Sequence, residues 1–86
     1  MMFLKLYYIF KDWTIIRPGG LKSEASTGNN AFLTENTKVS GVINRADVAA
    51  LILKALGSDG KCTRRVFSAI DPSLAPPINS VQAFTF

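Results

Sequence analysis

The sequence predicts an α/β fold, and within that class the C-terminal strands and helix of a doubly wound sheet. Three segments support this prediction: an apolar run at 13–16, a helix at Arg45–Leu56 and a second apolar run at 66–70. A strand, a helix and a strand in this order form a parallel pair through a right-handed crossover. The length of 86 residues allows one small domain.

The first strand, at 13–16, contains Trp, Thr and two Ile and is followed by Arg17 and Pro18. Because Pro18 lacks an N–H group, it cannot donate to a strand ladder, so the strand must end there. Continuous apolar character indicates a strand that is covered on both faces, as in a parallel sheet. Two strands and one helix cannot provide that cover. We therefore expect only part of the sheet, without its earlier strands.

The helix at Arg45–Leu56 has signals at both ends. Asn44 is a suitable N-cap, and Asp47 lies in the first turn, where the helix dipole favours a negative charge. Gly57 supplies the position after the helix where a positive φ is common. The broad apolar stripe predicts packing against both a sheet and a neighbouring helix; it comprises Val48, Ala49, Leu51, Ile52, Leu53, Ala55 and Leu56.

The remaining segments are less regular. Residues 3–10 carry apolar side chains at helical spacing and predict a short helix. Two short stretches, 31–34 and 38–42, could pair as a hairpin. The end of the chain contains two adjacent prolines and scattered apolar residues. We therefore expect residues 1–72 to form the partial domain and residues 73–86 to form a poorly ordered tail.

Composition excludes several kinds of site. The chain has no His and a single Cys62, which rules out His-dependent nucleophiles and an internal disulfide. Six scattered carboxylates indicate no metal site. Ten Lys and Arg give a net charge of +4, but the basic residues lack interleaved aromatic residues, so no nucleic-acid partner is predicted. The apolar N-terminal stretch of about ten residues is too short to span a bilayer, so no membrane partner is predicted either.

Two motifs carry a family resemblance. Residues 13–21, WTIIRPGGL, resemble the sixth-strand motif of the atypical short-chain dehydrogenase/reductase family, and are most similar to its plant and cyanobacterial members. Residues 41–50, GVINRADVAA, resemble the start of the helix that follows in that family. The likeness covers residues 13–72 and implies a partial Rossmann-like fold, an NAD(P) cofactor and a dinucleotide ligand.

The resemblance also implies a candidate cofactor site. In the family, the backbone after this strand contacts the nicotinamide end of the dinucleotide, which here corresponds to Pro18, Gly19 and Gly20. Glycine suits such a contact because the missing Cβ lets the main chain approach a flat ring. The alternative is that Pro-Gly-Gly is only a strand terminator and tight turn. No G-x-G-x-x-G fingerprint is present in the sequence, so we do not expect this chain to bind NAD(P) by itself.

No catalytic residue is predicted. Tyr7 and Lys11 fit the Tyr-x-x-x-Lys pattern of many short-chain dehydrogenases, but they precede the strand and should lie at its amino end, away from a cofactor at its carboxyl end. Arg17 could reach a phosphate or a substrate carboxylate, or form a structural salt bridge with Asp47 or another carboxylate.

The leading functional hypothesis is a truncated NAD(P)-binding protein, related to oxidoreductases and inactive alone because the phosphate-binding half is missing. Whether the chain is an enzyme is left open. The alternative is a non-enzymatic interaction module that completes the sheet of another chain, or associates with itself, through exposed strand edges. A third possibility is a small basic binding protein unrelated to dehydrogenases. The single cysteine fits an intracellular location, in the cytoplasm or a plastid, but the sequence does not identify the compartment.

Overall fold

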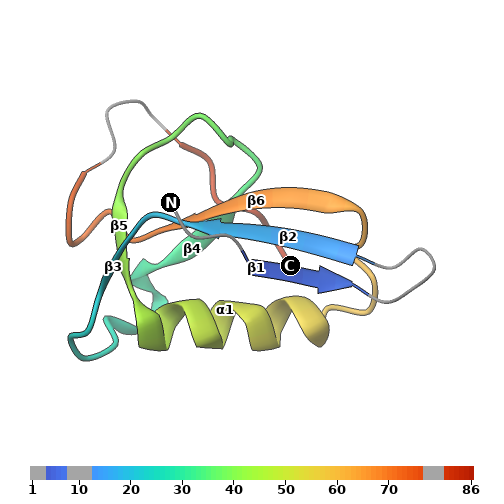
Figure 1. Ribbon diagram of the computed structural model, residues 1–86, viewed down its shortest axis with the longest axis horizontal. Coiled ribbons are helices and arrows are strands. Elements are labelled where there is room, and N and C mark those ends of the chain that lie inside the picture. Colours follow the sequence, from blue (N-terminus) through green and yellow to red (C-terminus); the bar gives the residue numbers. More distant parts are fainter. Residues whose placement is uncertain (1–3, 8–12, 77–80) are drawn as a thin grey trace.

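The computed structural model describes residues 4–7, 13–76 and 81–86, the first of these ranges by backbone alone. Figure 1 shows the arrangement of its elements. In chain order these are β1 (Leu4–Tyr7), β2 (Trp13–Pro18), β3 (Gly20–Lys22), a 3-10 turn η1 (Gly28–Asn30), β4 (Phe32–Thr34), β5 (Val42–Asn44), α1 (Arg45–Leu56) and β6 (Arg65–Ile70).

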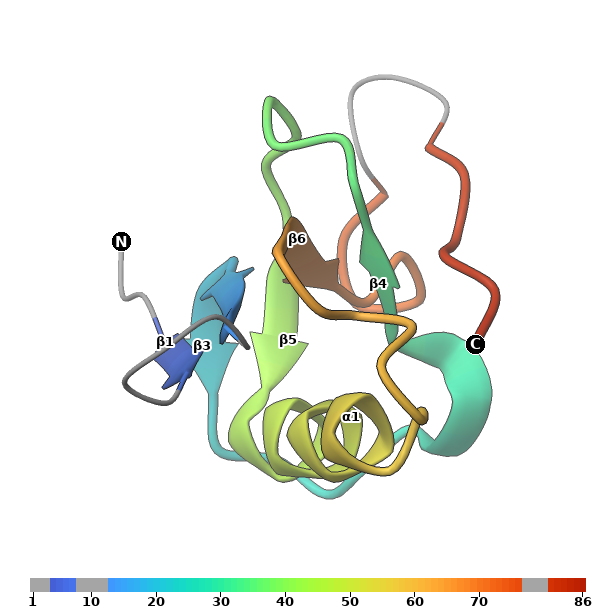
Figure 2. The ribbon, with the colours of Figure 1, turned by 90° about the vertical axis from the view of Figure 1, so that its right-hand side faces the viewer.

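The main sheet has four strands in the order β1-β2-β6-β4. Strands β2 and β6 are parallel, with Ile16 opposite Phe67, and the two outer pairs are antiparallel. A smaller sheet joins β3 and β5 in parallel. Figure 2 shows α1 along one face of these strands. The α/β class and the parallel pair joined through a helix are therefore confirmed.

Strand β2 is covered differently from the prediction. Thr14, Ile16 and Pro18 are buried, whereas Trp13 and Ile15 are half-buried, so burial alternates along the strand. This pattern arises because α1 covers one face and no described helix covers the other. Both edges of β2 are paired, one with β1 and one with β6. The expectation that this chain lacks the strands needed to flank β2 is therefore wrong.

Two other segment predictions are also wrong. Residues 4–7 form strand β1 instead of part of a helix; the rest of the predicted helix, at 3 and 8–10, lies outside the described residues. An apolar run of this length fits either structure, and pairing with β2 decides the outcome. The stretches 31–34 and 38–42 do not form a hairpin, because β4 pairs with β6 and β5 pairs with β3.

Helix α1 has the predicted bounds, but its ends differ in detail. The Asn44 side chain makes no capping bond; its amide donates to the carbonyl of Ala25 at 2.9 Å and so fastens the loop that follows β3. Gly57 has a φ of −88°, so it does not use the left-handed conformation. On the helix face away from the sheet, Leu53 and Leu56 are 69% and 63% exposed. The predicted second helix against this face is not found in the described parts of the chain.

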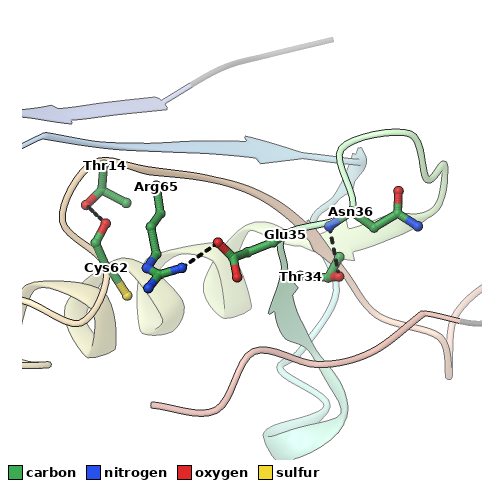
Figure 3. Close-up of polar contacts among 6 residues, drawn as sticks. All are labelled: Thr14, Thr34, Glu35, Asn36, Cys62 and Arg65. Carbon is green, nitrogen blue, oxygen red and sulfur yellow. Dashed lines mark hydrogen bonds and ion pairs between the residues drawn. The ribbon is translucent and has the colours of Figure 1, made fainter.

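The loop after α1 is anchored to the amino ends of the parallel strands (Figure 3). The buried hydroxyl of Thr14 donates to the carbonyl of Cys62 at 2.7 Å. Arg65, at the start of β6, forms an ion pair of 2.8 Å with Glu35, which follows β4. Cys62 itself is buried. These contacts join β2 to the loop after α1, and β6 to the residue after β4.

Beyond Pro18, the chain exchanges one strand partner for another. The Gly19 N–H donates to the carbonyl of Ala69 in β6 at 3.0 Å, whereas the Gly20 N–H donates to the carbonyl of Gly41 at 2.9 Å. A Cβ atom on Gly19 would lie 2.4 Å from the Gly41 oxygen. The change of partner therefore requires a residue without a side chain.

The described end of the chain packs on the core. Residues 81–86 contain no helix or strand, yet the Phe84 ring lies 4.8 Å from that of Phe67 in an edge-to-face arrangement. The Phe84 N–H also donates to the carbonyl of Leu33 in β4 at 2.7 Å. The prediction of a poorly ordered tail did not foresee these contacts.

The one helix in the described ranges, α1, has 12 residues, and none there has the length and apolar character needed to span a membrane.

The Gly19→Ala variant should lose about 1–3 kcal/mol of unfolding free energy, since the new methyl group overlaps the Gly41 carbonyl and the backbone must move. Urea denaturation followed by circular dichroism measures the loss. The control is Gly57→Ala, whose added Cβ has its nearest neighbour at 3.5 Å and an ordinary φ. Equal stability of the two variants would contradict the assigned partner exchange.

The Phe84→Ala variant should lose about 1–3 kcal/mol of unfolding free energy, because it removes the ring contact with buried Phe67. The matched control, Leu53→Ala, truncates a side chain that is 69% exposed and should change stability by about 0.5 kcal/mol or less. Thermal unfolding distinguishes the two. If Phe84→Ala unfolds at the same temperature as the wild type, the described end of the chain does not pack on the core in solution.

Candidate cofactor site

A cavity of about 250 Å³ lies at the carboxyl end of β2, beside the last residues of β6. Its walls come from three segments that are distant in the sequence: the end of β2, the residues before β5 and the end of β6. The lining residues are Arg17, Pro18, Gly19, Gly20, Val39, Ser40, Gly41, Ser68 and Ile70. The partner exchange at Gly19 creates this junction, because it brings the residues before β5 against the end of β2.

All three residues of the predicted site line this cavity. Pro18 is buried, Gly19 is half-buried and Gly20 is exposed. The N–H groups of both glycines are already donated, to Ala69 and Gly41, so they are not available to a ligand. The two glycines of the Pro-Gly-Gly segment therefore contribute only backbone to the wall of the cavity, which a ligand can approach closely.

Sequence reasoning missed the opposite wall. Ser40 and Gly41 line the cavity from the residues before β5, and Ser68 and Ile70 line it from β6. Gly41 is tightly packed, since a Cβ atom there would lie 3.0 Å from the Ile70 Cγ2 atom. The signal was present in part, because Gly41 begins the second family motif. Ser40 and Ser68 stand in no motif that would have identified them.

Arg17 brings a charge to the cavity. It is half-buried, it stands opposite Ser68 in the ladder between β2 and β6, and its Nε atom is shielded from solvent. The hydroxyls of Ser40 and Ser68 add groups that can both donate and accept hydrogen bonds. The cavity therefore combines a cation, two hydroxyls and a largely apolar wall. Such a combination is suited to a small ring that carries a polar substituent.

Tyr7 lies at the other end of the strand pair. Its backbone is opposite Trp13, the first residue of β2, whereas the cavity begins at the last residues of that strand. At about 3.3 Å per residue, the two ends are roughly 17 Å apart. Lys11 lies outside the described residues. The backbone of Tyr7 therefore lies at the amino end of β2, where the sequence predicted it, and away from the cavity. Within the described ranges, no cluster of three or more metal-ligating side chains occurs.

Two buried carboxylates hold the loop between β3 and η1 against the body of the protein. Asp47 in α1 accepts a hydrogen bond from the Ser26 hydroxyl and another from the Thr27 N–H at 3.1 Å. Asp71, directly after β6, accepts one from the Thr27 hydroxyl and one from the Ser73 N–H at 2.9 Å. One short segment, 26–27, is thus fastened both to the helix and to the sheet.

The contacts of Asp71 set its ionisation. Desolvation acts to raise the pKa of Asp71. Hydrogen bonds from the Ser73 and Thr27 hydroxyls and from the backbone N–H groups of Ser73 and Leu74 favour the charged form and outweigh that effect. The pKa of Asp71 therefore lies below its ordinary value of 3.8.

Because the pKa of Asp71 is lower in the folded protein, its charged form adds stability above about pH 4, and this stability is lost as the pH falls through the folded pKa. The Asp71→Asn variant should therefore be less stable than the wild type by about 1–3 kcal/mol at pH 7, with a smaller difference near pH 2.5. Urea denaturation across this pH range measures it. Asp59→Asn, in an exposed turn, serves as the control with little change at either pH. A pH-independent effect of Asp71→Asn would refute the linkage.

Comparison with known proteins identifies the family to which part of this chain is similar. Residues 10–59 match a family model described as NAD(P)H-binding. The chain is also similar to an uncharacterized chloroplastic protein of Arabidopsis thaliana, with 44% identity over 45 residues. That alignment covers 52% of this chain but 16% of the relative, so the matched segment is about one sixth of the relative's length. No solved structure matches the chain.

The family match spans more than half of the 86 residues and contains both Pro18-Gly19-Gly20 and Gly41. It therefore includes two of the three segments that line the cavity; the third, at the end of β6, lies beyond it. The mixed sheet with one helix agrees with an NAD(P)-binding domain. This chain belongs to the NAD(P)H-binding, Rossmann-like family.

Proposed function

We propose that this chain provides the nicotinamide side of a dinucleotide site, in a protein related to the oxidoreductases of the atypical short-chain dehydrogenase/reductase family. The observation that carries the proposal is the cavity of about 250 Å³ at the carboxyl end of β2, lined by Pro18, Gly19 and Gly20. In α/β sheets with parallel strands, ligands bind beyond the carboxyl ends of those strands. The parallel pair of β2 and β6 gives this cavity that position.

The residues of the cavity fit one end of the cofactor. Sites that enclose a drug-sized ligand usually measure about 300–1,000 Å³, so a cavity of about 250 Å³ suits a single ring with a small substituent. Gly20 leaves one wall open, and the hydroxyls of Ser40 and Ser68 can bond to a carboxamide group. When bound, the nicotinamide ring supplies the hydride chemistry. The chain's own contribution is to position the ring and to exclude water from one of its sides.

The sequence lacks the motif that binds the adenosine and pyrophosphate ends of the cofactor in dinucleotide-binding proteins. The sequence has no G-x-G-x-x-G turn after a strand. At the N-terminus of α1, where a helix can receive a phosphate, the side chains of Asn44 and Asp47 bond instead to Ala25 and Ser26 of the loop after β3. We therefore propose that this chain binds the whole dinucleotide with nearly the same affinity as its nicotinamide half. We also propose that the chain by itself has no redox activity.

The alternative proposal is an interaction module that pairs through a strand edge. Strand β4, at one end of the sheet, has its outer edge partly covered because Leu33 accepts a bond from the Phe84 N–H. Strand β1, at the other end, is the stronger candidate for pairing with a second chain. The absence of cofactor binding, combined with a concentration-dependent dimer, would favour this alternative.

Titration of the labelled full chain with reduced nicotinamide mononucleotide, NADPH and AMP, followed by amide chemical shifts, tests the proposal. The first two ligands should shift the signals of Gly19, Gly20 and Gly41 with Kd values of about 1 mM, within about threefold of each other, and AMP should not. Gly20→Ala adds a methyl group at ordinary contact distance from Val42 and should weaken binding severalfold.

Gly57→Ala, at the end of α1 and outside the cavity, is the control and should bind as the wild type does. Shifts that map to residues away from the cavity would disprove the proposed site. NADPH binding at micromolar Kd would show that this chain holds the phosphates after all, and would overturn the proposal that it lacks activity for want of a phosphate site.

A further inference from the structure

We infer that the outer face of α1 is a docking surface for an acidic amphipathic helix of another protein. The outer face is defined by five exposed apolar residues: Ala46, Ala49, Ala50, Leu53 and Leu56. The first four follow one another at the spacing i, i+3, i+4 and i+7, which places them along one side of a helix. The inference is independent of the proposed cofactor site, since none of the five lines that cavity.

The outer face exposes large apolar side chains. Leu53 and Leu56 are 69% and 63% exposed, and they are the exposed large hydrophobic residues of the described ranges. The opposite side of α1, with Val48, Leu51 and Ala55, is buried in the core. In Figure 1, α1 forms the lower edge of the molecule and the strands lie above it. The helix therefore has one apolar stripe that the fold buries and a second that the described segments leave exposed.

The charges beside the outer face favour an acidic partner. The exposed charged residues of α1 are Arg45 and Lys54, and both are positive. The one carboxylate of the helix, Asp47, is buried and bonds to the loop after β3. A partner helix with Glu or Asp beside its apolar stripe would therefore meet cations on α1 and no exposed carboxylate. The net charge of +4 attracts an acidic partner over longer distances as well.

A hollow at the end of α1 extends the outer face. It measures about 550 Å³ and is lined by Lys54, Gly57, Ser58, Asp59, Lys61 and Phe86. Gly57 lies one turn after Leu53 and so connects the outer face to the hollow. The lining contains two ammonium groups and one carboxylate, and the Lys54 Nζ atom lies 6.0 Å from the centre of the Phe86 ring. The hollow can therefore receive an acidic side chain from the end of a docked helix, as an anchor in a pocket.

Two other occupants fit these observations less well. A second copy of this chain would bring Arg45 and Lys54 of both copies into one interface, without an exposed carboxylate on either helix to pair with them. A membrane of anionic lipids would meet the cations and the leucines. A plane of headgroups, however, uses neither the helical spacing of the face nor the hollow at its end. Both occupants are outcomes of the test.

The test uses the full chain and a synthetic helix as the probe. The acidic probe has about 18 residues, so that it is long enough to be helical, with Leu along one side and Glu on both flanks of that side. A second probe carries Gln in place of each Glu. Fluorescence anisotropy should give a Kd of about 10–100 μM for the acidic probe at low salt. The Gln probe should bind about tenfold more weakly, and this ratio should fall as salt is added.

Variants of exposed residues locate the binding surface. Leu53→Ala should weaken binding of the acidic probe by about fivefold or more, because it removes apolar area from the interface. Ala49→Glu should abolish binding, because it places a carboxylate in the middle of the face. Lys54→Gln should weaken the acidic probe and leave the Gln probe unchanged. The matched control is Lys38→Gln, which removes the same charge from an exposed position between β4 and β5 and should bind as the wild type does.

Several outcomes would overturn the inference. These are equal Kd values for the two probes, wild-type binding by Leu53→Ala, and no binding of either probe at about 1 mM. A concentration-dependent dimer that Ala49→Glu dissociates would assign the face to a second copy instead. Binding to vesicles of phosphatidylserine and phosphatidylcholine that Leu53→Ala weakens, without binding of the acidic probe, would assign it to a membrane surface.

Discussion

The close contact between two glycine backbones determines much of this structure. Gly19 is bonded to β6 and Gly20 to the residue before β5, and the Gly41 carbonyl lies where a Cβ of Gly19 would have to be. This contact lets one continuous segment pair with two different neighbours, so the four-stranded sheet and the small sheet of β3 and β5 share a junction. The cavity lies at that junction. Its position is a consequence of how the backbone is paired, and the side chains that line it add charge and hydrogen-bonding groups to a space that already exists.

A second set of contacts joins the loop after β3 to the helix and to the end of β6. Segment 26–27 is bonded to Asp47 of α1 and to Asp71 after β6, so the helix and the sheet hold the same loop. Both carboxylates are buried, and each is bonded to hydroxyl or N–H groups, which is the usual condition under which a buried charge is tolerated. The Asp71 N–H also donates to the carbonyl of Val42 in β5 at 2.8 Å. Loss of the charge on Asp71 would thus affect a residue that connects the end of β6 to β5 and to Thr27.

The sequence was most informative where local chemistry determines structure. The parallel strands, the bounds of α1 and the position of Pro18-Gly19-Gly20 beside a cavity all follow from apolar runs, end signals and a motif. The sequence was less informative where strand pairing determines the structure. Residues 4–7 have apolar spacing that suits a helix, but they form a strand because they pair with the edge of β2. Ser40, Ser68 and Phe84 were missed for a related reason. Their roles come from contacts between segments far apart in the chain, and a single serine or phenylalanine gives no local sign of such a contact.

The proposed function separates two requirements of a dinucleotide site, one for each end of the cofactor. In the proposed site, the nicotinamide ring would lie at the junction of β2, β5 and β6, and strand β1 pairs with the second edge of β2. The pyrophosphate side depends on a helix N-terminus whose polar groups can face the ligand, and here Asn44 and Asp47 at the start of α1 bond to a loop of the same chain. Pairing of β2 on both edges means that the cavity does not need further strands to hold its shape. Under the proposed function, a fold of this kind binds the nicotinamide ring without features that hold the rest of the cofactor.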